Sequence, residues 1–257
     1  MLLAINHLRG MSIHAQDGDL GKADDFYFDD KEWTIRYIVA DVGSWLERHK
    51  VLISPASVRT IAPDLKRFMT GLTKDQVRDS PSWSTDKPIS RQYETLFADY
   101  YDYPYYWGAI EGMGYAPTAS GAMAMSRPQV HSPEEVAEIK AEIAQSHLRS
   151  ARAVGGYAIE AKDGDIGTVN DFIFDEQNWQ IHYLVIDTGK WLPGRKVLIS
   201  PLWIESIDWS RSKVITRLNR ETIKNAPGYD DPAMITREYE KRLFAYYGEP
   251  GYWTEAA

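Results

Sequence analysis

The amino-acid sequence predicts a mainly β protein with some α structure: two tandem small β-barrels, each followed by short C-terminal helices and an aromatic tail. Three observations predict this fold: a long internal repeat, hairpin patterns inside each copy, and helical spacing of apolar residues late in each copy. Aligned without gaps at an offset of 146, residues 10–61 match residues 156–207 at 26 of 52 positions. We therefore expect two domains, residues 1–107 and 156–257, joined by a linker over residues 108–155.

Within each copy, two runs rich in aromatic and β-branched residues indicate a hairpin. In the first copy they are residues 22–29 and 33–42, separated by three polar residues. One face of the second strand is identical in both copies: Trp33, Ile35, Tyr37, Val39 and Asp41 recur as Trp179, Ile181, Tyr183, Val185 and Asp187. Because the opposite face varies, we expect the invariant face to form the barrel interior.

The end of each copy has helical patterns and then a short aromatic segment. Thr73 and Gln76 form a capping-box pattern, and residues 86–101 and 231–247 carry apolar residues at helical spacing. Each copy then ends in an aromatic stub, residues 103–107 and residues 250–253. Such stubs can stack on single-stranded nucleic acid, but they more often complete a core or an interface. The candidate interface residues are Tyr106, Trp107, Tyr252 and Trp253.

The linker has no counterpart inside either copy. Its first part is rich in Gly, Pro, Ala and Met and is typical of a loop. Its second part predicts one helix, because Ser132 suits the N-cap, Pro133 suits the first helical position, and Val136, Ile139 and Ile143 form an apolar stripe.

The combined motifs resemble the PRC-barrel domain. They are the Asp-Gly turn at residues 17–21, the Asp-Phe-x-Phe-Asp strand at 25–29, the Trp-x-Ile-x-Tyr-x-Val strand at 33–39 and Lys-Val-Leu-Ile-Ser-Pro at 50–55, each repeated in the second copy. The family is named after the cytoplasmic domain of the photosynthetic reaction centre H subunit, and a related domain ends a ribosome maturation factor. The resemblance implies a docking module, without the membrane helix of the former or the N-terminal domain of the latter.

Composition narrows the function classes. The chain has 29 basic and 37 acidic residues, a net charge of -8, and no basic half that would bind a phosphate backbone. Without cysteine it has no disulfide or thiolate metal site, which fits a cytoplasmic location. No run approaches the length of a transmembrane segment. We therefore expect no nucleic-acid partner and no transmembrane segment.

Several carboxylates are candidate sites. Asp17 and Asp19, with Asp163 and Asp165, offer oxygen ligands to a hard cation, but the Asp-Gly pairs also suit tight turns, and we expect no metal. Asp41 and Asp187 lie at the end of the invariant strand face. Each is either a buried functional carboxylate or a structural acid that is hydrogen-bonded to the following turn. No histidine has metal-ligand spacing, and no nucleophile or dinucleotide motif is present, so the sequence predicts no catalytic residue and no cofactor.

The leading hypothesis is a non-enzymatic protein-interaction or scaffold protein built from two PRC-barrel domains, whose partner the sequence does not identify. An RNA- or ribosome-associated factor is the alternative by analogy with the maturation factor, and an enzyme using Asp41 or Asp187 is a third. We also expect the two copies to pack as an intramolecular pseudo-dimer, because duplicated domains inherit a self-complementary surface.

Overall fold

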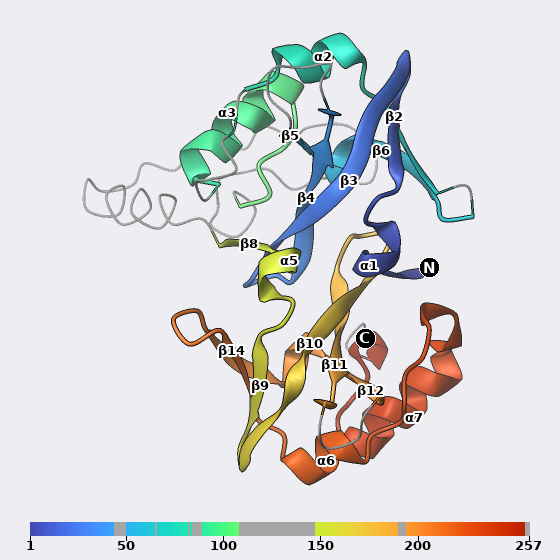
Figure 1. Cartoon of the computed structure of the whole chain (residues 1–257), viewed down its shortest axis with the longest axis vertical. Helices are drawn as coiled ribbons and strands as arrows, with labels where there is room; N and C mark the ends of the chain where they lie inside the picture. Colours follow the sequence, from blue (N-terminus) through green and yellow to red (C-terminus); the bar gives the residue numbers. More distant parts are fainter. Residues whose placement is uncertain are drawn as a thin grey trace.

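A computed structural model of the chain describes residues 1–43, 50–64, 66–81, 83, 89–107, 147–189 and 194–254. It contains two mixed sheets of seven strands each, one per repeat, which lie end to end in Figure 1. Helices lie at the two outer ends and on opposite sides of the two sheets. The expected mainly β fold of two tandem β domains is confirmed. The expected linker helix and the turns at residues 44–49 and 190–193 lie outside the described residues.

The first repeat forms the sheet β5-β4-β3-β2-β7-β6, in which only β2 and β7 are parallel among these pairs. Its described elements, in chain order, are β1 (Leu2–Ala4), α1 (Ile5–Leu8), β2 (Ser12–Ala15), β3 (Gly18–Asp29), β4 (Thr34–Asp41), β5 (Lys50–Ile53), η2 (Pro55–Ser57), β6 (Val58–Ala62), β7 (Arg67–Thr70), α2 (Lys74–Asp79) and α3 (Arg91–Tyr101).

The second repeat forms the equivalent sheet β12-β11-β10-β9-β14-β13. Its described elements are β8 (Leu148–Ser150), α5 (Ala151–Val154), β9 (Ala158–Ala161), β10 (Gly164–Asp175), β11 (Ile181–Asp187), β12 (Lys196–Ile199), η4 (Pro201–Trp203), β13 (Ile204–Asp208), β14 (Lys213–Thr216), α6 (Arg220–Lys224), η5 (Pro232–Met234), α7 (Arg237–Tyr247) and η6 (Tyr252–Thr254).

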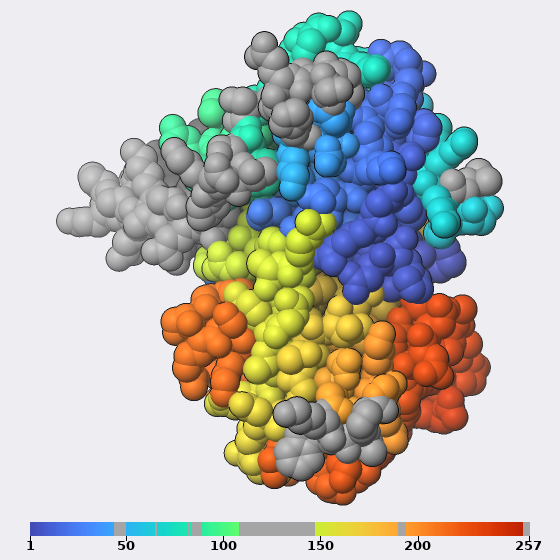
Figure 2. Space-filling model, viewed as in Figure 1, coloured from blue at the N-terminus to red at the C-terminus, as the bar shows by residue number. Residues whose placement is uncertain are grey.

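The first strand of each repeat belongs to the sheet of the other repeat. β1 pairs with β10, so that Leu2 lies opposite Asp175, and β8 pairs with β3, so that Leu148 lies opposite Asp29. The short helices α1 and α5 follow these strands at the level where the two sheets meet (Figure 1). In Figure 2 the yellow-green residues that begin the second repeat lie against the blue first repeat. The repeats therefore exchange their first strands.

Two aspartates repeated in both copies hold the exchanged segments. Asp171 accepts the backbone N–H of Asn6, at 3.1 Å, in the first turn of α1, and Asp25 accepts the N–H of Arg152, at 3.0 Å, in the first turn of α5. A carboxylate at this end of a helix satisfies amides that have no partner within the helix. Burial raises the pKa of Asp171 to about 6, even though these amide hydrogen bonds favour its charged form.

A third junction lies between the tips of the β3–β4 and β10–β11 hairpins. Ile35 donates its N–H to the carbonyl of Trp179 at 2.9 Å, and Ile181 donates to the carbonyl of Trp33 at 2.6 Å. Both tryptophans have a left-handed backbone, with φ of 51° and 62°, a conformation that is rare for large side chains. Each contact recurs with the two repeats exchanged.

The prediction that the invariant face forms the barrel interior is wrong for Tyr37 and Val39 of β4, whereas their counterparts Tyr183 and Val185 lie in the main core. Ile35, with the variable Ile38 and Ala40, lies in the main core, whereas Tyr37 and Val39 pack in a separate cluster beside α3. The cause is a bulge, because the register with β3 shifts between the pairs Tyr27–Tyr37 and Phe28–Ile35, leaving Arg36 as the extra residue. The bulge turns Arg36 and Tyr37 toward the same side.

The repeats also differ in detail from the expected boundaries. The second repeat begins at β8, within the segment that the sequence assigned to the linker. The capping box of Thr73 and Gln76 is present at the start of α2. The last helices start later than expected, at Arg91 and Arg237, because Ser90 and Thr236 cap them. Among the described helices, none is long and apolar enough to cross a membrane.

Candidate functional site

Each repeat buries one glutamate beneath its aromatic stub. Glu94 lies on α3 and Glu240 on α7, 146 residues apart, and their side chains are 0% and 4% exposed. A buried carboxylate is stabilised only when it is hydrogen-bonded and paired with a charge. In both repeats the partners are the same: one arginine from the same helix, one tyrosine from the sheet and one tyrosine from the stub. We call this group of four residues the glutamate cluster.

In the first repeat the glutamate cluster comprises Glu94, Arg91, Tyr37 and Tyr106. Arg91 lies 2.8 Å from Oε2 of Glu94, one helical turn away, and both tyrosines donate their hydroxyl to Oε1. The Arg91 guanidinium also lies 4.3 Å from the ring centre of Trp107. The stub is therefore bound to α3 through both of its last two aromatic residues.

In the second repeat the cluster comprises Glu240, Arg237, Tyr183 and Tyr252. Both tyrosine hydroxyls donate to Oε1 of Glu240 at 2.7 Å, and Arg237 lies 3.0 Å from Oε2. The Arg237 guanidinium lies 4.5 Å from the ring centre of Trp253. The two clusters thus have the same connections.

Burial controls the ionisation of these groups. Desolvation raises the pKa of Glu94 to about 7, although Arg91 and the Tyr106 hydroxyl favour its charged form. Desolvation also raises the pKa of Tyr106 and Tyr183 well above the ordinary value, and that of Tyr252 to about 12, so these phenols stay protonated. The tyrosines therefore act as hydrogen-bond donors to the glutamate.

The strand bulge adds one more residue beside each stub, and here the repeats differ. In the first repeat the Arg36 guanidinium lies 3.9 Å from the ring centre of Tyr106. In the second repeat His182 holds the equivalent position, with its ring 4.4 Å from that of Tyr252. Burial lowers the pKa of His182, so the imidazole is neutral at pH 7. The first repeat therefore carries an additional positive charge at this place.

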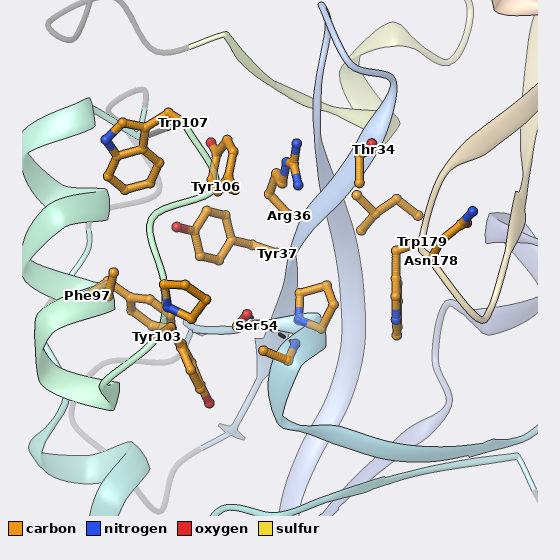
Figure 3. A pocket seen from close by; sticks show the side chains of 15 residues that line it. Thr34, Arg36, Tyr37, Ser54, Phe97, Tyr103, Tyr106, Trp107, Asn178 and Trp179 are labelled. Carbon is orange, nitrogen blue, oxygen red and sulfur yellow. Dashed lines mark hydrogen bonds between the residues drawn. The ribbon is translucent and has the colours of Figure 1, made fainter. Parts of the chain in front are cut away.

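A cavity of about 220 Å³ lies next to the first stub. Figure 3 shows Arg36 and Tyr37 extending from β4 toward Tyr106, with Asn178 and Trp179 of the second repeat on the opposite side. Aromatic and small residues complete the lining: Thr34, Ile35, Ser54, Pro55, Ala56, Phe97, Ala98, Tyr103, Pro104 and Trp107. The cavity thus lies at the junction of both repeats, and Tyr106 and Tyr37 separate it from Glu94.

The second repeat fills the equivalent space with larger side chains. Phe244 stands where the first repeat has Ala98, and its ring lies 5.1 Å from Trp253 and 6.0 Å from Tyr252. Trp203 stands where the first repeat has Ser57, is fully buried, and lies 5.1 Å from Phe244. As a result, α7 packs into the main core, whereas α3 contributes to a separate cluster.

The carboxylates considered from the sequence have structural partners. Asp41 and Asp187 accept the N–H of Gly43 and Gly189, at 3.0 and 2.8 Å, which is the hydrogen bond to the following turn that was one of the two interpretations. The backbones of β3 and β4 approach closely here, because a Cβ on Gly21 of β3 would lie 2.1 Å from the carbonyl oxygen of Asp41 at the end of β4.

The Asp-Gly-Asp turns are also tied to the fold. Asp17 and Asp163 accept the first backbone N–H of α2 and α6, from Lys74 and Arg220. Asp165 lies 2.9 Å from the amine of Lys213. In the described part of the chain, no three His, Asp or Glu side chains are grouped so that they could hold a metal ion.

The four candidate interface residues fall into two pairs. Tyr106 and Trp107 line the cavity, whereas Tyr252 and Trp253 pack on Phe244 and Arg237 of their own repeat. That these residues bind a partner stays a prediction. Sequence reasoning missed Arg36, Arg91 and Glu94, although the offset of 146 pairs Arg91 with Arg237 and Glu94 with Glu240 and was a usable signal.

Comparison with known families supports the fold. The family model described as PRC-barrel domain matches residues 2–77 and 151–221, more than half of the chain. Both matched segments end before α3 and α7, so each glutamate cluster combines a tyrosine of the matched barrel with residues from outside the match. A comparison with curated proteins gave no match.

Proposed function

Since this chain belongs to the PRC-barrel family in both of its repeats, we propose that it is a non-enzymatic protein-interaction or scaffold protein whose docking site is the cavity of the first repeat. The observation that carries the proposal is the difference between the repeats at this place: open and lined by aromatic residues in the first, filled by Phe244 in the second. A protein that needed the two stubs only for stability would have gained from filling both.

The lining of the cavity supports binding rather than catalysis. It offers Tyr, Trp and Pro surfaces with an arginine, residue types enriched where proteins recognise partners. Among the described residues that line it, the ionisable side chains are Arg36 and three tyrosines, and none is a carboxylate or histidine suited to acid–base chemistry. Asp41 and Asp187, the acids of the enzyme hypothesis, are bonded to their own turns instead.

We further propose that the two repeats act as one intramolecular pseudo-dimer. The strand exchange, the two aspartate caps and the paired hairpin tips each recur with the repeats exchanged, as contacts do across a two-fold interface. This arrangement keeps Asn178 and Trp179 at the edge of the first repeat's cavity. A cytoplasmic location is part of the same proposal, and a chain without cysteine fits a reducing compartment.

Site-specific photo-crosslinking in cells tests the proposed function. A photoreactive phenylalanine at Ala56, an exposed residue of the cavity lining, is expected to give an adduct with one protein. The matched control is Leu202, its counterpart in the second repeat, which is 57% exposed and lies on the filled side. The adduct at position 56 should disappear when Ala98→Phe fills the cavity.

Three outcomes would contradict the proposal. Adducts of equal yield at positions 56 and 202 would mean that the cavity is not the docking site. Adducts that a nuclease removes would indicate an RNA partner. An adduct that persists in the Ala98→Phe variant, with the fold intact by circular dichroism, would place the contact elsewhere on this face.

A further inference from the structure

The guanidinium of Arg36 is not paired with a carboxylate of any residue that the structure describes. Among the residues that the structure describes, Arg36 has no ion pair or hydrogen bond, and its Nε is buried without a partner. Its contact is with the face of the Tyr106 ring. Arg36 as a whole is half-buried, and its guanidinium, which has no counter-charge among the described residues, gains charge-assisted hydrogen bonds when an anion enters.

The neighbouring charges do not cancel that of Arg36. Arg91 is paired with Glu94 inside the glutamate cluster and donates to the Tyr106 hydroxyl, which leaves Arg36 as the additional charge. In the second repeat the same cluster pairs Arg237 with Glu240, and the neutral His182 adds no charge. The cavity and the extra positive charge therefore occur together in the first repeat, whereas at the equivalent place in the second repeat Phe244 packs on Tyr252 and Trp253 beside a neutral His182.

The size of the cavity limits what it can hold. Its volume of about 220 Å³ is smaller than the roughly 300–1,000 Å³ of pockets for drug-sized ligands. It suits one or two side chains of a protein segment better than a whole cofactor or nucleotide. The rings of Tyr103, Tyr106, Trp107 and Trp179 with Pro55 favour an apolar or aromatic side chain next to the charged group.

We propose that this cavity binds an Asp or Glu side chain next to an aromatic residue, within a segment of a partner protein, and that Arg36 selects the carboxylate. The proposal rests on the proposed function and adds the chemistry of the ligand. Arginine forms strong, directional hydrogen bonds with carboxylates. The acidic side chain and the guanidinium would meet at the edge of Tyr106, while the aromatic side chain enters among the rings.

The direct test is an NMR titration of the full-length protein with capped peptides. Acetyl-Phe-Glu-Phe-amide and acetyl-Phe-Gln-Phe-amide differ only in the charge of the central residue. We expect the Glu peptide to bind with an about tenfold lower Kd, because hydrogen bonds to charged groups are stronger than neutral ones. The preference should weaken as the salt concentration rises, and the shifts should map to β4, η2 and the first stub.

Two further probes separate other ligands. The peptide acetyl-Phe-Gln-Phe with a free C-terminal carboxylate should bind like the neutral peptide, and a uridine hexamer should bind more weakly than the Glu peptide. Equal affinity for the Glu and Gln peptides would overturn the ligand assignment while leaving the proposed docking function standing. Tighter binding of the free carboxylate or of the RNA would overturn it as well.

Variants taken from the second repeat provide the controls. Arg36→His should abolish the preference for Glu and leave the Kd of the Gln peptide unchanged, because the rings remain. Ala98→Phe should weaken both peptides at least tenfold. His182→Arg places an arginine beside the filled site and should change neither Kd. If Arg36→His keeps the tenfold preference, Arg36 does not select the carboxylate, whether or not the Ala98→Phe variant folds.

Discussion

The two repeats share their junction contacts and their glutamate clusters but differ in the space beside the stub. At the junction, each contact of Asp25, Trp33 and Ile35 has its counterpart at an offset of 146. Beside the stub, Ala98 and Ser57 of the first repeat become Phe244 and Trp203 in the second. Residues that hold the two halves together have thus been kept in both copies, whereas beside the stub a few positions have diverged within a lining that is otherwise largely shared.

The largest expected effect concerns the junction contacts that both repeats share, and it comes from producing the two repeats as separate fragments. Residues 1–107 alone lack β8, which leaves the β3 edge uncovered, and residues 147–257 alone lack β1. We expect each fragment to give a poorly dispersed NMR spectrum or to self-associate through the free strand. An equimolar mixture should recover the spectrum of the intact chain as a one-to-one complex. Two fragments that stay monomeric and natively folded would show that the exchange is dispensable.

The next prediction concerns the difference between the filled and the open space. Phe244→Ala should lower the free energy of unfolding by about 3–5 kcal/mol, because it opens a hole between Trp203, Tyr252 and Trp253. The reverse change, Ala98→Phe, enters an existing cavity and should alter the free energy by less than about 2 kcal/mol. Chemical denaturation of both variants is the measurement. Similar losses in both would mean that the first space is not open in solution.

These comparisons also show what could be read from the sequence. The repeat, the hairpin strands and the Thr73–Gln76 capping box follow from local patterns, which is why they were predicted correctly. The exchange of β1 and β8 was not, because residues 2–4 and 148–150 share only one identical residue, Leu2 with Leu148. Nothing in a three-residue strand indicates which of two similar sheets it will join.

The misassigned strand face has a different cause. Strict alternation assumes no extra residue, but the bulge at Arg36 places Ile35 in the core and Tyr37 toward α3. Tyr37 and its counterpart Tyr183 both donate to a buried glutamate, which accounts for a tyrosine at this position in both copies. The cavity was also unpredictable, since it depends on which small residues face each other across distant segments.

A third prediction uses the raised pKa of Glu94. Because its pKa rises from 4.5 to about 7 on folding, the folded chain binds a proton more readily than the unfolded chain between these values. Stability should therefore fall as the pH rises through this window, by an amount on the order of 3 kcal/mol from this group. Glu94→Gln should remove that slope, as measured by denaturation between pH 4 and 8.

Asp171→Asn is the matched comparison for this pH effect. The pKa of Asp171 rises from 3.8 to about 6, so its contribution also falls with rising pH but ends near pH 6. This variant should flatten the profile below pH 6 and leave the fall between pH 6 and 7 in place. A wild-type profile that is flat or rising from pH 4.5 to 7 would contradict the burial of both groups.

The smallest expected effect tests the equivalence of the two Asp-Gly-Asp turns. Asp17 and Asp163 are both hydrogen-bonded to helix amides, and among the residues that the structure describes neither turn has further acidic neighbours positioned for a metal. Adding millimolar calcium or a chelator should therefore change the Tm by less than about 1 °C. A calcium-dependent rise of several degrees that is lost in Asp17→Ala or in Asp163→Ala would show a metal site in that turn.

The exchanged strands also bear on how the chain is synthesised. β1 leaves the ribosome first, but its partner β10 ends at Asp175, 173 residues after Leu2. At elongation rates of about 5–20 residues per second, β10 is completed roughly 10 to 35 seconds after β1 has been synthesised, and β1 has no partner strand during that time. The β3 edge is likewise bare until Leu148 emerges. During that interval two neighbouring nascent chains on one messenger can pair with each other, so slower initiation or a bound chaperone should raise the yield of monomer.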